Sequence, residues 1–132
     1  YMGYLPAKNI KPIMALMNVL LMPYQSNVSV GVDNIDTAKW MSPIKMFEYM
    51  SAGLPIVASN FPSWEILVKE IGCGLTVDPL DPDAISHAIS WLLKRPEEAE
   101  RMGLAGREAI KTKYNWNLEG EKLVAFYNNL FK

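Results

Sequence analysis

The chain has 132 residues, half of them hydrophobic, which is enough to bury one core and fits a single domain. Its 13 Lys and Arg residues nearly balance its 14 Asp and Glu residues, and neither sign forms a long run. This composition argues against a nucleic-acid partner and favours a neutral or small ligand. Cys73 is the only cysteine, which excludes an internal disulfide and a multi-cysteine zinc site and fits a reducing compartment.

These features lead us to expect a cytoplasmic protein. No apolar run approaches the ~20 residues that span a bilayer, so any membrane association should be peripheral. The first residues, YMGYLPAKN, lack the basic-then-apolar pattern of a signal peptide. Because they look like the end of a strand without an initiator methionine, we expect the chain to be part of a longer protein.

Short apolar runs alternate with helical patterns along the chain. The runs have the length and continuity of strands buried on both faces of a parallel sheet, and we expect them at about 19–22, 55–59 and 74–77. Helices are predicted at Ile10–Met17, Pro43–Ala52, Trp64–Ile71 and Pro82–Lys94. Strands that alternate with helices predict an α/β fold with a parallel sheet.

Two further helices, Glu97–Lys111 and Leu118–Phe131, are predicted with no strand between them. The last carries more apolar side chains than a solvent-facing helix needs, so we expect it to pack on a partner or to form a dimer contact. The interval Tyr24–Met41 is longer than the roughly two to six residues usual between a strand and a helix, which is typical of functional or disordered loops.

The stretch SPIKMFEYMSAGLPIVAS, residues 42–59, places charge beside buried segments. Ser42 suits an N-cap and Pro43 the first helical position, so Lys45 should lie in the first turn and Glu48 one turn later. The start of this helix should lie at the carboxyl ends of the strands, where open α/β sheets bind ligands. Its amides and Lys45 favour a phosphate, and Glu48 is placed to accept both hydroxyls of a ribose. The alternative is an ordinary solvent-facing ion pair between Lys45 and Glu48.

This stretch, followed by PSWEIL and GCGLTVDPLDPDAIS, resembles the C-terminal donor-binding domain of group 1 (family 4) glycosyltransferases of the GT-B fold. The resemblance covers essentially the whole chain. It implies a Rossmann-like three-layer α/β/α domain with a parallel sheet, the C-terminal half of a GT-B fold, incomplete at its N-terminus. Residues 1–132 would then form one partial nucleotide-sugar-binding domain, and the N-terminal acceptor domain of the same protein would lie outside this chain.

The family carries two glutamates separated by seven residues at the donor site. Glu48 matches the second, which in relatives holds the ribose, whereas the first falls on Trp40. Trp40 in place of the first glutamate is a departure from the family pattern, and it concerns how the donor sugar is held. The SPxKxFEYM variant is similar to a subgroup of bacterial surface-polysaccharide enzymes, in which Lys45 would supply charge near the diphosphate.

The resemblance implies the following site. The donor nucleotide and its phosphates would be bound by Ser42, Ile44, Lys45 and Glu48, and the donor sugar would be contacted by Trp40, Met41 and Glu65. No catalytic residue is assigned within the chain, and no cofactor and no metal are expected, because GT-B enzymes generally need no metal for chemistry.

Other polar residues have simpler explanations. His87 lies on the polar side of its helix, opposite the apolar stripe, and Asp81 and Asp83 are explained by an aspartate N-cap followed by proline. Cys73 is expected to be a packing residue. Glu65 has the alternative of capping its helix. The loop residues Asp33, Asn34 and Asp36 are expected to be solvated, with donor or acceptor contact as the alternative.

The sequence therefore predicts part of a retaining glycosyltransferase that moves a sugar from a nucleoside diphosphate sugar to an acceptor hydroxyl, in bacterial surface polysaccharide or glycolipid synthesis. The chain alone is expected to be inactive. The alternative is a non-catalytic nucleotide-sugar-binding or scaffolding module of the same fold.

Overall fold

The computed structural model describes residues 3–26 and 41–130, which form six helices and three strands. The elements are α1 (Ala7–Met14), β1 (Leu20–Met22), α2 (Ile44–Ala52), β2 (Ile56–Ser59), α3 (Pro62–Ile71), β3 (Gly74–Val77), α4 (Pro82–Leu93), α5 (Pro96–Thr112) and α6 (Trp116–Leu130).

The three strands form a parallel sheet in the order β1-β2-β3, as the alternation of strands and helices predicts. Leu20 of β1 lies opposite Ile56, which in turn lies opposite Gly74 of β3. Every residue of the central strand β2 is buried, which agrees with its continuous apolar sequence. The predicted α/β architecture is confirmed.

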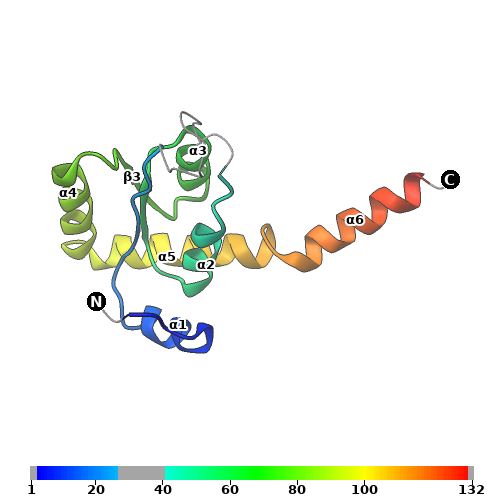
Figure 1. The fold of residues 1–132 in the computed structure, drawn as a ribbon, viewed down its shortest axis with the longest axis horizontal. Coiled ribbons are helices and arrows are strands. Elements are labelled where there is room, and N and C mark those ends of the chain that lie inside the picture. Colours follow the sequence, from blue (N-terminus) through cyan, green and yellow to red (C-terminus); the bar gives the residue numbers. More distant parts are fainter. Residues whose placement is uncertain (1–2, 27–40, 131–132) are drawn as a thin grey trace.

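Helices cover both faces of the sheet, which gives three layers (Figure 1). On one face, Met46 and Met50 of α2 and Trp64 of α3 pack against β1 and β2. On the other face, Ala88 and Leu92 of α4 pack against Val57. Helix α5 runs along one end of the sheet and contributes to both clusters, because its first half packs on the α4 side and its second half on the α2 side.

Local signals explain most helix ends. Gly53 and Gly72 have φ values of 76° and 69°, the left-handed conformation in which glycine ends α2 and α3 at no steric cost. Asp81 caps α4, because its side chain accepts hydrogen bonds from the amides of Asp83 and Ala84. The expected aspartate cap is therefore present, and it explains the Asp-x-Asp spacing locally.

The first helix differs from its predicted range, Ile10–Met17, by three residues at each end. It begins directly after Pro6 and ends at Met14. Residues 15–17 continue as tighter turns, in which the amides of Leu16 and Met17 donate to the carbonyls three residues earlier.

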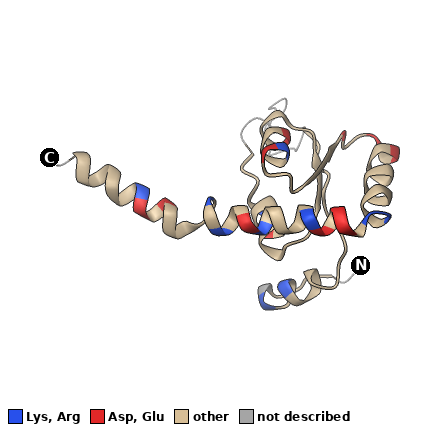
Figure 2. Ribbon diagram, turned by 180° about the vertical axis from the view of Figure 1, so that it is seen from behind, with Lys and Arg blue, Asp and Glu red and all other residues tan. Residues whose placement is uncertain are grey.

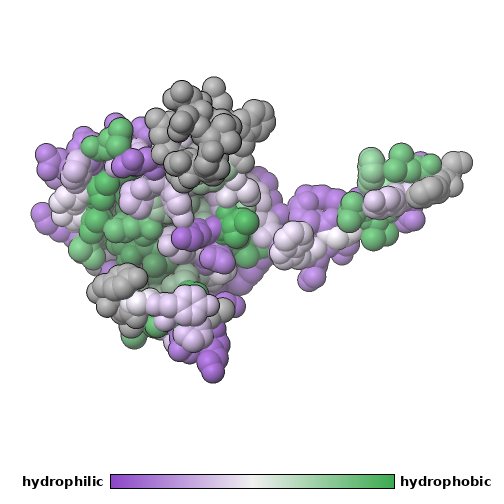
Figure 3. Space-filling view, in the orientation of Figure 1, coloured by the Kyte–Doolittle hydropathy of each residue, from purple (hydrophilic) through white to green (hydrophobic). Residues whose placement is uncertain are grey.

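Helix α6 extends away from the layered body (Figure 1). It has no buried residue, and its exposed side chains include Phe126 and Tyr127, which are 59% and 52% exposed. Figure 3 shows hydrophobic side chains gathered on its distal half. The predicted apolar terminal helix is thus present with its apolar side chains open, whereas Phe131 lies outside the described residues.

Helices α5 and α6 carry charged residues of both signs (Figure 2). The ion pairs on these two helices join residues three apart: Arg101 to Glu98 at 2.6 Å, Lys111 to Glu108 at 3.9 Å and Lys122 to Glu119 at 2.6 Å. Such exposed pairs contribute about 0.2–1 kcal/mol each. Within residues 3–26 and 41–130, no helix has both the length and the apolar character that a membrane span needs.

Candidate donor site at the carboxyl end of the sheet

A hollow of about 210 Å³ lies beside the carboxyl end of β1, where α2 begins. Its walls come from β1 and the residues that follow it, from the chain entering α2, and from α3. The lining residues are Met22, Tyr24, Met41, Ser42, Pro43, Ile44, Lys45 and Trp64. Most of these side chains are apolar, and Lys45 is the charged residue among them.

The start of α2 differs from the sequence prediction by one residue. We expected Ser42 to cap the helix and Pro43 to be its first residue, but Pro43 is at the cap position and the helix begins at Ile44. The ψ angle of Pro43, 54°, keeps this residue outside the helical conformation, and the Ser42 side chain accepts no amide of the first turn. Instead, the Ser42 carbonyl accepts the amide of Ile44 at 2.9 Å.

This arrangement leaves the helix start without a side-chain cap. The amide of Met46 donates to the Pro43 carbonyl at 2.9 Å, whereas the Lys45 amide has no acceptor among the described backbone and side-chain groups. Backbone donors at a helix N-terminus and the partial positive charge of the helix both attract anions. The Lys45 ammonium adds a full positive charge at the same place.

Lys45 stays cationic at this site. Its pKa is raised above the ordinary value of 10.5, mainly by the neighbouring Tyr24 side chain, while partial burial acts in the opposite direction. Its Nζ atom lies 5.6 Å from the centre of the Tyr24 ring. A cation that rests on a tyrosine and remains open to solvent is available to an incoming anion.

Hydrogen bonds and ring contacts connect the residues at the base of the hollow. Trp64, only 1% exposed, donates its indole N–H to the Met41 carbonyl at 3.3 Å and so ties α3 to the chain entering α2. The ring of Tyr24 meets the Trp64 ring edge-on, with ring centres 5.8 Å apart. Ser59, the last residue of β2, is buried, and its hydroxyl donates a hydrogen bond of 2.6 Å to the Tyr24 carbonyl.

The structure brings together some of the predicted site residues and separates others. Met41, Ser42, Ile44 and Lys45 line the hollow. Glu48 is exposed one turn further along α2 and Glu65 is exposed in the first turn of α3, and neither is among the lining residues. Trp40, Asp33, Asn34 and Asp36 lie outside the described residues.

The ion pair proposed as the simpler explanation of Lys45 and Glu48 is not formed. Among the ion pairs of the described residues, none joins these two side chains, although the charge of Glu48 contributes to the raised pKa of Lys45. The Glu48 carboxylate therefore remains open to a ligand. Glu65 makes no capping hydrogen bond to α3, because Phe61 occupies the cap position without a side-chain bond.

The sequence interpretation did not include Tyr24 as a site residue. Its signal is its position, directly after β1 and Pro23, which places it at the carboxyl end of a strand of the parallel sheet. Trp64 belongs to the stretch PSWEIL, which carries part of the family resemblance, but its place in the lining of the hollow depends on a hydrogen bond to the Met41 carbonyl and was not predicted.

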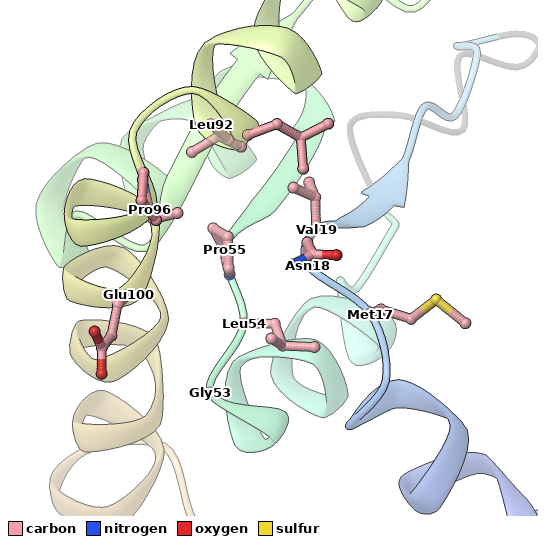
Figure 4. Close-up of a pocket in the computed structure, with 11 residues that line it drawn as sticks. Met17, Asn18, Val19, Gly53, Leu54, Pro55, Leu92, Pro96 and Glu100 are labelled. Carbon is pink, nitrogen blue, oxygen red and sulfur yellow. The ribbon is translucent and has the colours of Figure 1, made fainter.

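A second hollow, of about 230 Å³, lies at the opposite end of the sheet, between the start of β1, the turn after α2 and α5. Figure 4 shows Val19, Pro55 and Leu92 around it. Glu100 is the charged residue of its lining, to which the described residues contribute no basic side chain. Because open α/β sheets bind ligands at the carboxyl ends of their strands, the hollow beside Lys45 is the candidate site.

The other polar residues that the structure describes do not form a second centre. The residues that the structure describes contain no group of three or more His, Cys, Asp or Glu side chains placed to share a metal ion. His87 is exposed on α4. Cys73 is fully buried, and burial raises the pKa of its thiol to about 11, as suits a packing residue.

The chain thus combines a parallel α/β fold with an uncapped helix start and a lysine beside the carboxyl ends of the strands, an arrangement suited to an anionic ligand. Residues 1–109 match the family model described as "Glycosyl transferases group 1". The chain therefore belongs to the group 1 glycosyl transferases.

Curated relatives agree with this assignment. The chain is 32% identical over 83 residues, 63% of its length, to the GDP-mannose-dependent alpha-(1-6)-phosphatidylinositol monomannoside mannosyltransferase of Mycobacterium tuberculosis. It is 29% identical over 90% of its length to the enzyme of the same name from Mycolicibacterium smegmatis. It is also 28% identical over 69% of its length to spore coat protein SA of Bacillus subtilis. The chain spans 22%, 30% and 25% of the lengths of these three proteins, respectively.

A solved structure has the same fold. Sucrose-phosphate synthase from Thermosynechococcus elongatus superposes with a TM-score of 0.77 at 24% identity, over 98% of this chain and 29% of that chain. This likeness confirms the expected Rossmann-like α/β fold of GT-B type.

Proposed function

We propose that residues 1–132 form the donor-binding part of a longer retaining glycosyltransferase. This enzyme transfers a sugar from a nucleoside diphosphate sugar to an acceptor hydroxyl, in the synthesis of a bacterial surface polysaccharide or glycolipid. The acceptor-binding domain is supplied by the rest of the protein. The observation that carries the proposal is the uncapped start of α2, which presents a backbone amide and the Lys45 ammonium beside a hollow at the carboxyl end of the sheet.

The proposed division of labour follows from charge and position. The Lys45 ammonium, the free Lys45 amide and the chain from Ser42 to Ile44 bind the diphosphate and stabilise the negative charge that develops as it departs. Glu48, one turn further along α2, accepts the ribose hydroxyls. Preorganised positive groups of this kind act without a metal ion, and the nucleotide sugar is a substrate rather than a cofactor.

In this proposal, the donor sugar lies beside the hollow and is contacted by Trp40, Met41 and Glu65. The names of the mycobacterial relatives specify GDP-mannose as their donor, which supports a nucleotide sugar as the ligand class here. We place the enzyme in the cytoplasm, with peripheral rather than spanning membrane association. A nucleic-acid partner is not part of the proposal.

Nucleotide titration tests the proposal directly. The isotopically labelled chain is titrated with GDP, UDP and ADP, and amide shifts are followed by NMR. We expect at least one nucleotide to shift the amides of 41–48 with saturation, and Lys45→Met to weaken its binding about tenfold, the scale of a lost charge-assisted hydrogen bond. Lys69→Met is the matched control and should leave binding unchanged, because Lys69 is an exposed residue of α3 that does not line the hollow. Absence of saturable shifts with all three nucleotides would contradict the proposal.

A non-catalytic nucleotide-sugar-binding or scaffolding module is the second candidate, and Trp40 in the place of the family's first glutamate favours it. Sugar transfer separates the two. We expect the complete protein to transfer sugar and the 132-residue chain to transfer none, because acceptor binding lies elsewhere. A complete protein that binds nucleotide and yet never transfers sugar would favour the module.

A further inference from the structure

The pairing of Tyr24 with Lys45 has no part in the site that the sequence predicts. Both residues line the hollow, and the Lys45 Nζ atom lies 5.6 Å from the centre of the Tyr24 ring. No carboxylate forms an ion pair with Lys45 among the described residues. The ammonium therefore lies against a neutral aromatic side chain, and its positive charge is available to an anionic ligand.

Tyr24 is fixed from three directions. Its amide donates to the Met22 carbonyl at 3.0 Å, and its own carbonyl accepts the buried Ser59 hydroxyl at 2.6 Å. Its ring rests edge-on against Trp64, which is itself hydrogen-bonded to Met41. The backbone and ring of Tyr24 are thus anchored in the core, whereas Lys45 reaches the hollow on a flexible four-carbon stem.

The side chains around the Lys45 ammonium all favour its charged form. Tyr24, Tyr49 on the same helix as Lys45, and Glu48 all raise the pKa of Lys45, and Tyr24 contributes most. Tyr49 is a weaker partner, because its hydroxyl donates to the Leu21 carbonyl at 3.5 Å. A long side chain that is already aligned loses less rotamer freedom when a ligand binds.

We propose that Tyr24 is a positioning residue, which holds the Lys45 ammonium at the rim of the hollow where it meets the diphosphate; this rests on the proposed function of the hollow. Tyr24 acts through Lys45 and not on the donor itself. The hydroxyl and the ring both contribute, so Tyr24→Phe removes part of the effect and Tyr24→Leu removes all of it.

The first experiment does not need a nucleotide. Lysine labelled with ¹³C at the ε carbon allows the titration of Lys45 to be followed by NMR in the folded chain. The Lys45 midpoint should fall in Tyr24→Phe and fall further in Tyr24→Leu. Tyr114→Phe is the matched control, because the Lys113 Nζ atom lies 5.2 Å from the centre of the Tyr114 ring and neither residue lines the hollow. An unchanged Lys45 midpoint in folded Tyr24→Leu would overturn the pairing.

The second experiment is a double-mutant cycle on the affinity for the nucleoside diphosphate that binds best among GDP, UDP and ADP. Tyr24→Phe should weaken binding by about two- to fivefold, the scale of one neutral hydrogen bond. In the Lys45→Met background the same substitution should have no further effect, because the group that Tyr24 positions is absent. Tyr114→Phe should leave affinity unchanged in both backgrounds.

The outcomes distinguish this inference from the proposed function. An equal loss from Tyr24→Phe with and without Lys45 would show that Tyr24 acts on the ligand or on the fold, and would overturn the positioning role. If wild type binds none of the nucleotides, the proposed function fails and the diphosphate role of Tyr24 fails with it. The lysine titration would then still decide whether Tyr24 holds Lys45.

Discussion

Gly103 of α5 packs directly against the carbonyl of Gly53, the residue that ends α2, and a Cβ atom at position 103 would overlap that oxygen. Three residues along α5, Gly106 is buried against Met50 and Cys73, where a Cβ would lie 3.2 Å from each side chain. Two glycines therefore let α5 support the far end of the helix whose start carries Lys45.

We expect Gly103→Ala to destabilise the fold, because the new methyl group meets backbone and not the end of a flexible side chain. Overpacking of this kind costs about 1–3 kcal/mol. Gly120→Ala in α6 is the matched control. A Cβ there has no neighbour within 4 Å, so the higher helix propensity of alanine should stabilise α6 by roughly 0.5–1 kcal/mol. Urea unfolding of both variants measures the difference, and equal stabilities for Gly103→Ala and wild type would refute the close-packing argument.

Cys73 provides a prediction on pH. Burial raises the pKa of its thiol from 9.0 to about 11, so the unfolded chain releases this proton first as the pH rises. The stabilisation is complete below pH 9 and is lost as the pH rises towards 11. The loss is on the order of 2–3 kcal/mol, since one unit of pKa corresponds to about 1.4 kcal/mol.

Cys73→Ala isolates this contribution from other groups that titrate in the same range, such as Tyr49, whose pKa is also raised by burial. The free energy of unfolding should fall more steeply between pH 9 and 11 in wild type than in the variant. Parallel curves for the two proteins would show that the thiol is not responsible. The native thiol should also resist a disulfide reagent at pH 8 and react on unfolding.

Local sequence signals predict the fold well because each element depends on its own residues. The apolar run of β2, the glycines after α2 and α3, and the Asp81 cap are all visible in a single short window. The site is harder to predict, because its parts meet only in three dimensions. Tyr24 faces Lys45 because Ser59 and Trp64, both far along the chain, fix its backbone and ring. The capping of α2 was predicted wrongly because Pro43 has the φ of a first helical residue but not its ψ.

Self-association through α6 is a third prediction. It carries a group of apolar residues that are each more than half exposed to solvent, which includes Leu123, Phe126, Tyr127 and Leu130. The chain should therefore form dimers or larger species as its concentration rises, detectable by sedimentation. Replacing Phe126 and Tyr127 together by serine should shift the equilibrium towards monomer, whereas Asn129→Ser should not. A wild type that stays monomeric at high concentration would contradict this prediction.

The carboxylate of Glu48 is exposed and forms no ion pair among the described residues, although Lys45 lies one turn away on the same helix. If Glu48 accepts the ribose hydroxyls, Glu48→Gln removes the charge and leaves one acceptor oxygen. Hydrogen bonds to charged groups contribute roughly 1.5–3 kcal/mol, and about 1.4 kcal/mol corresponds to tenfold in affinity, so the complete enzyme should bind its nucleoside diphosphate at least several-fold more weakly. Folding should change little, because the substitution is nearly isosteric and glutamine is a good helix former.

Glu70→Gln is the control for the loss of one negative charge, because Glu70 is an exposed residue of α3. Calorimetric titration of the three proteins decides the matter, and equal dissociation constants for wild type and Glu48→Gln would remove Glu48 from the site.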